Sequence, residues 1–271
     1  MQRIRPSYWR VFVTFARNCW VRDMTFRVNF LINVTTVTAW SVLIVAFFHV
    51  IFMHTGTIGK GWGRYEYFAF LATGMIVNGL IETFFFSNCT EFSEHIRKGT
   101  LDFVLLKPID TQFLASLEKI DWSSLSSVLI GAGVLTYGLV HLANPPGLMA
   151  ILLYVVFVGV GVAIYYSLLI VLASLSVWMG RNQGMENFWF YITVFARYPR
   201  NIYEGGWGNA LRTVFTYAIP VLVVINVPAE VVAGMFNPTL AAYAVFAAVA
   251  SLAISRQVLE WALRNYRSAS S

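Results

Sequence analysis

Residues 91–121, EFSEHIRKGTLDFVLLKPIDTQFLASLEKID, are the one long polar stretch in the first half of the chain. They contain ten charged side chains, and an apolar segment long enough to cross a membrane lies on each side of them. Hydrocarbon cannot solvate such a run, so it must lie in water or at the membrane surface. The stretch is therefore predicted to be a surface element that joins two membrane-spanning helices.

The composition supports a membrane protein throughout. Of the 271 residues 58% are hydrophobic and only 12% are charged, and the mean hydropathy is +0.65. Soluble domains carry about 25% charged residues. We expect a single transmembrane domain over residues 1–271. The net charge of +6 fits basic residues at the inner membrane surface and contacts with lipid, so no nucleic-acid partner is expected.

The apolar segments predict an all-α integral membrane protein with six transmembrane helices. An aromatic and arginine-rich helix at residues 1–27 should lie along the membrane interface. Residues 180–212 mix arginines with aromatic rings and glycines, and are expected to form a second interfacial segment. The six spans are expected at about residues 28–54, 65–88, 122–142, 148–179, 213–227 and 239–259.

The distribution of basic residues predicts the orientation. With these six spans, all but Lys60 and Arg64 of the 19 lysines and arginines lie on one side of the membrane. Positive residues concentrate on the cytoplasmic side of membrane proteins. Both termini are therefore expected in the cytoplasm, in a multi-pass protein of the cytoplasmic (inner) membrane.

Asn78 and Glu82 are the polar pair of interest inside a predicted span. They are four residues apart, on one face of the helix, and a carboxylate in the membrane should face protein or a water-filled path. The pair either lines a translocation path or contacts a neighbouring helix. No HExxH, GxSxG or phosphate-binding motif occurs, so no enzyme activity, metal or cofactor is expected on this chain. The alternative is an intramembrane enzyme, or a channel or scaffold without energy coupling, centred on Glu82.

Residues 96–110, IRKGTLDFVLLKPID, resemble the I-R-x-G-x-L-D-x-x-L-L-x-P-x-D signature of a permease family in the type-2 exporter class of ATP-binding-cassette (ABC) transporters. Residues 196–199, ARYP, and the motifs between residues 219 and 234 are similar to later parts of the same family. The likeness extends in span order over nearly the whole chain.

The resemblance implies a permease subunit that pairs with a second copy or a paralogue. It also implies two cytoplasmic ATPase subunits, which would bind ATP and Mg, and export of a substrate by alternating access. The aromatic, weakly charged spans suit an amphipathic or lipophilic substrate. By this likeness residues 91–98 resemble the coupling helix that docks on the ATPase, with Phe92 and Ile96 as anchors. The expected docking residues are Glu91, Phe92, Glu94, Ile96, Arg97, Lys98, Gly99 and Asp102.

Overall fold

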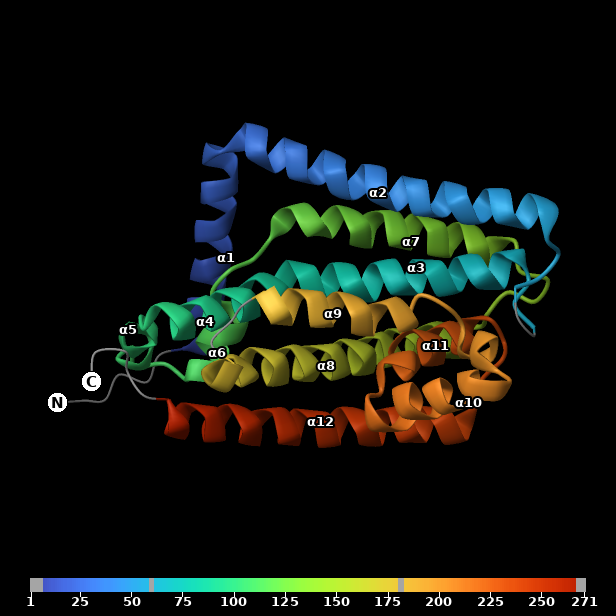
Figure 1. Ribbon diagram of the computed structural model, residues 1–271. Helices are drawn as coiled ribbons and strands as arrows, with labels where there is room; N and C mark the ends of the chain where they lie inside the picture. Colours follow the sequence, from blue (N-terminus) through green and yellow to red (C-terminus); the bar gives the residue numbers. More distant parts are fainter. Residues whose placement is uncertain (1–6, 59–60, 180–182, 267–271) are drawn as a thin grey trace.

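The computed structural model describes residues 7–58, 61–179 and 183–266, and its named elements are all helices. Five helical rods are long and apolar enough to cross a membrane, and they run side by side (Figure 1). The prediction of an all-α integral membrane protein is confirmed. The rods are α2 (Arg27–His54), a composite rod (Arg64–Lys98), α7 with the turn before it (Trp122–Val140), α8 (Leu148–Met179) and α12 (Pro238–Asn265).

The composite rod joins the second predicted span to the predicted docking helix. It consists of α3 (Arg64–Ile81), a π-helical turn (Glu82–Phe86) and α4 (Ser87–Lys98). We expected the span to end at residue 88 and a separate helix to follow at residues 91–98. The rod is continuous because no proline or glycine occurs between its π turn and Gly99. Any movement of the end of α4 is therefore transmitted directly to α3.

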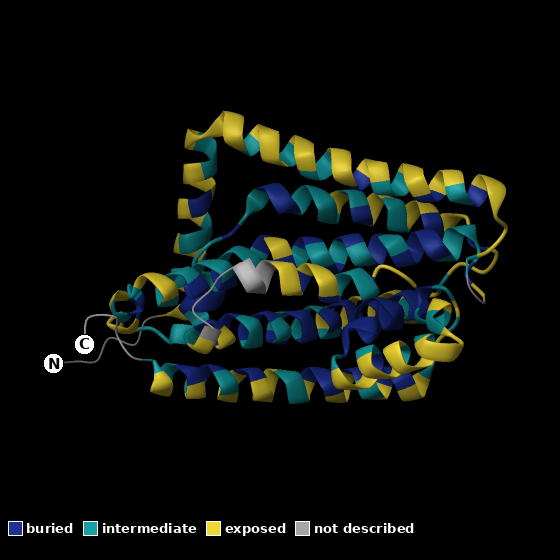
Figure 2. Cartoon of the chain, viewed as in Figure 1, coloured by how far each residue is buried: buried dark blue, intermediate teal, exposed yellow. Residues whose placement is uncertain are grey.

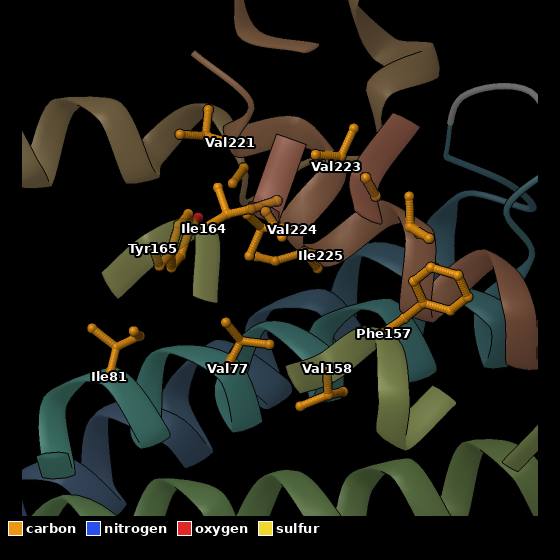
Figure 3. Close-up of a cluster of buried hydrophobic side chains, with 14 of the residues drawn as sticks. Val77, Ile81, Phe157, Val158, Ile164, Tyr165, Val221, Val223, Val224 and Ile225 are labelled. Atoms are coloured by element: carbon orange, nitrogen blue, oxygen red, sulfur yellow. The ribbon is translucent and has the colours of Figure 1, made fainter. Parts of the chain in front are cut away.

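Close helix packing fixes the centre of the bundle. A Cβ atom on Gly131 of α7 would lie 3.0 Å from the Cβ of Met75 on α3, so glycine allows these helices to approach. Every residue of α11 (Val221–Val232) is buried. Its valines pack against α3 and α8, as the cluster around Val77, Tyr165 and Val224 shows (Figure 3). The helix is thus shielded by protein on all sides.

Helix α1 (Tyr8–Thr25) runs across the direction of the long rods at one end of the bundle (Figure 1). The Tyr8 ring lies 5.0 Å from Phe113, and the Trp20 ring lies 5.6 Å from Trp122. Most of the helix is exposed away from these contacts (Figure 2). The interfacial position of residues 1–27 stays a prediction, and residues 1–6 of that segment lie outside the part of the chain that the structure describes.

The fifth predicted span is not a straight helix. Residues 206–218 and 221–232 form two helical pieces that meet at 87°, with α10 (Gly206–Thr213) and a π turn (Val214–Ala218) preceding α11. Pro220 stands at the bend, where it cannot continue the hydrogen-bonding pattern of the first piece. Both pieces lie at the end of the bundle opposite α4 (Figure 1). Pro228 lies inside α11 and does not end it.

Helix α9 (Gln183–Phe195) corrects the expected interfacial segment at residues 180–212, of which residues 180–182 lie outside the described residues. It lies alongside the bundle, where its Trp189 ring is 5.1 Å from Tyr165 of α8 (Figure 1). It carries the chain from the α4 end to the opposite end. Its arginine-rich continuation therefore lies at the end where we expected only Lys60 and Arg64. The segment therefore consists of an apolar helix followed by a loop that contains arginines. Its mixed composition does not show where the helix ends.

Candidate functional site

The end of α4 is set by a glycine cap. Gly99 has a left-handed backbone with φ of 69°, its N–H donates to the Ile96 carbonyl at 3.2 Å, and the Thr100 N–H donates to the His95 carbonyl at 3.0 Å. This paired arrangement is the Schellman motif. It turns the chain sharply out of the rod and fixes the direction in which the next helix leaves.

The helix that leaves is α5 (Leu101–Leu105), which forms the tip of this end of the bundle (Figure 1). Its Leu101 and Val104 side chains are buried. Phe103 and Leu106 point the other way and are 72% and 81% exposed. Large apolar side chains that protrude from a charged surface are typical of anchors that enter a partner's pocket.

The charged side chains around this tip form exposed ion pairs. Glu94 accepts a hydrogen bond at 2.8 Å from Arg97 Nη2 and pairs with Lys98 at 3.1 Å. Glu91 pairs with Lys119 at 2.8 Å. Exposed pairs contribute little to stability because water replaces them readily.

Helix α6 (Thr111–Leu117) links this end to the last rod. Asp110 caps it by accepting from the Phe113 N–H at 3.1 Å, and both terminal nitrogens of Arg256 on α12 reach the same carboxylate, at 3.2 and 3.1 Å. Burial raises the pKa of Asp110, but the hydrogen bonds from Arg256 and Phe113 outweigh it and hold that pKa below its usual value. The tip is thus tied to two rods, α4 and α12.

The predicted docking residues fall into two groups. The prediction for Phe92 is wrong, because it is 3% exposed and belongs to the core, and Ile96 packs partly against that core. A helix of twelve residues that closes a bundle must turn its apolar face inward. The others lie at least partly at the surface of this end: Glu91, Glu94, Arg97, Lys98, Gly99 and Asp102.

Phe103 and Leu106 are the apolar surface residues that sequence reasoning missed. The signal was present, because both belong to the apolar run between Asp102 and Lys107 in the signature. The composition of the run alone does not show which of its side chains point inward and which point outward. At helical spacing, Leu101 and Val104 share the inner face and leave Phe103 and Leu106 outside.

A second feature is a groove between α2, α3 and α9 with a volume of about 670 Å³. Asn78 and Glu82 both line it, so the prediction that they share one face is confirmed. The Asn78 amide donates to the Gly74 carbonyl of its own helix at 2.8 Å. Aromatic rings make up much of the remaining wall: Trp40, Phe47, Phe48, Phe70, Phe86, Trp189 and Phe190.

The opposite end of the bundle joins the two later sequence motifs. Directly after ARYP, the Arg200 backbone N–H donates to Asn226 Oδ1 at 2.9 Å, and Arg200 Nε donates to Glu230 Oε1 at 3.1 Å. Glu230 is 7% exposed at its side chain. These contacts fasten the bent pair to the turn (Arg200–Tyr203) that follows α9.

One comparison with known protein families gives a match. The family model described as ABC-2 family transporter protein matches residues 38–270. This chain belongs to the ABC-2 transporter family. Members are membrane components of ABC transporters, which work with an ABC ATPase, so the chain is a transport permease. The predicted membership of an ABC permease family is confirmed, and the signature itself stays a prediction. The comparisons with curated proteins and with solved structures found no match.

Proposed function

We propose that the chain is the membrane subunit of an ATP-driven exporter and that the α4–α5–α6 end docks on a cytoplasmic ATPase. The ATP and Mg would be bound by that partner. This end would then face the cytoplasm, which places both α1 and the end of α12 there, in the inner membrane. A second permease copy or a paralogue would complete the membrane domain.

The observation that carries the proposal is the tip built by α5. Phe103 and Leu106 protrude from it, and the exchangeable pairs of Glu94 surround it. The tip is attached without a flexible linker to α4 on one side and, through Asp110 and Arg256, to α12 on the other. A push from closing ATPase subunits would therefore reach the rods that line the groove. The groove would carry an amphipathic or lipophilic substrate outward.

Co-purification tests the docking surface. The permease is expressed with the ABC ATPase encoded beside it, and the complex is isolated in detergent through a tag on the permease. We expect the wild type to retain the ATPase, and the double variant Phe103→Ala, Leu106→Ala to lose at least 90% of it. Removing two central anchors of an interface costs several kcal/mol, which corresponds to more than a hundredfold in affinity.

Trp207→Ala is the matched control, because Trp207 is 90% exposed at the opposite end of the bundle. It should leave the ATPase bound. Glu94→Lys should weaken binding in a salt-dependent way, since charges at an interface rim mainly steer association. If the double variant binds as well as the wild type, the ATPase does not dock on this tip.

A further inference from the structure

The wall of the groove has an electrostatic preference of its own. Rings from α2, from the composite rod and from α9 line it, among them Trp40, Phe86 and Trp189. An aromatic face carries negative charge density, so it attracts a cation and repels an anion. In a site away from bulk water this preference is stronger than at an exposed surface.

Glu82 is the acidic side chain in the described wall of this groove. Its side chain is exposed to the groove, and among the described residues it makes no hydrogen bond or ion pair. The π-helical turn begins at this residue, and such turns frequently occur at functional sites. A carboxylate in this setting lacks a countercharge.

Arg197 is the basic residue in the described groove wall, and it already has a partner. Its guanidinium carbon lies 5.4 Å from the centre of the Phe190 ring. It follows Phe195, the last residue of α9, by two positions. Among the described residues it forms no ion pair with Glu82.

We propose that the groove binds a lipophilic organic cation, such as a quaternary phosphonium or ammonium ion or a protonated amphipathic amine, with Glu82 as its countercharge. The rings surround the apolar groups of the cation, and the carboxylate replaces the hydration that the charge loses. As the substrate class of the exporter, this inference rests on the proposed function. As a binding property of the permease, it is testable without any ATPase.

The test uses two probes of nearly the same shape and opposite charge, tetraphenylphosphonium and tetraphenylborate. Binding of each to the purified permease in lipid nanodiscs is measured by equilibrium dialysis, with empty nanodiscs subtracted. We expect Glu82→Gln to weaken tetraphenylphosphonium binding about tenfold and to leave or strengthen tetraphenylborate binding. Glu66→Gln is the matched control, because Glu66 lies in the first turn of the same helix and does not line the groove.

A second variant keeps the proposal falsifiable should Glu82→Gln fail to fold. Asn78→Lys places a positive charge one helical turn from Glu82, and we expect it to abolish tetraphenylphosphonium binding and to favour the borate. Equal binding of the two probes by the wild type would overturn the proposal, as would an unchanged phosphonium affinity in both groove variants. Failure of the wild-type permease to retain the ATPase in the co-purification experiment would instead count against the exporter function alone.

Discussion

The two ends of the bundle are held by ion pairs that differ in burial. At the end with α10 and α11, Arg200 and Glu230 pair at 3.1 Å with side chains only 16% and 7% exposed. At the α4 end, Arg97 and Glu94 pair at 2.8 Å with side chains 48% and 28% exposed. A buried pair cannot exchange with water, whereas an exposed pair can. The first end is therefore built as a fixed closure, and the second as a surface that can accept a partner.

The largest expected effect is the loss of the buried pair. Arg200→Ala leaves the Glu230 carboxylate without its cation in a protected site, which costs about 3 kcal/mol. We expect the midpoint of thermal unfolding in detergent to fall by several degrees. Arg97→Ala at the other end is the matched control and should cause no measurable change. Equal effects of the two variants would remove the distinction between the ends.

A substitution that disturbs helix packing should lower the unfolding midpoint somewhat less, at the end that carries α10 and α11. A Cβ on Gly161 of α8 would lie 2.7 Å from the Val224 carbonyl oxygen of α11, whereas a Cβ on Gly159 would meet nothing within 4 Å. Gly161→Ala must push two backbones apart, at a cost of about 2 kcal/mol. Gly159→Ala on the same helix should cause no loss, because alanine favours helix more than glycine does. Unfolding of both variants by the same thermal assay tests the pair.

The contrast between the straight rods and the buried helix α11 explains which helices the sequence predicted correctly. Long apolar runs bounded by polar segments predicted the straight rods, since lipid imposes one simple requirement on each. Residues 221–232 are just as apolar, but protein surrounds them instead of lipid. Hydropathy does not separate these two environments. The contact between Arg200 and Glu230, thirty residues apart, was equally invisible.

As for the fold, only part of the candidate site was predicted from the sequence. The shared face of Asn78 and Glu82 followed from helical spacing, because it depends on neighbours in the chain. Phe92 depended on which face of α4 meets the rest of the bundle, and that is a property of the tertiary packing. The same packing decided that Phe103, and not Phe92, reaches the surface.

Substitution of Gly99, at the α4 end, should have a third and smaller effect on stability. Its φ of 69° costs an L-amino acid about 1 kcal/mol, so Gly99→Ala should lower the unfolding midpoint by a few degrees at most. Gly56→Ala, at a loop glycine with open space and no positive φ, is the control and should be neutral. If the tip transmits movement from an ATPase, Gly99→Ala should also reduce transport more than it reduces stability. A proportional loss of both would make Gly99 a purely structural cap.

The smallest effect concerns pH and the link between α6 and α12. Because the folded pKa of Asp110 lies below its usual value, its pairing stabilises the protein above about pH 4 and is lost as the pH falls through that lowered pKa. The carboxylate is 36% exposed, so screening limits the contribution to about 1 kcal/mol. Asp110→Asn keeps a side-chain oxygen for the helix cap but removes the charge that Arg256 contacts. The unfolding midpoints of wild type and variant should therefore differ at pH 7 and converge toward pH 3, and a difference that persists at low pH would assign the stabilisation to the cap rather than to the ion pair.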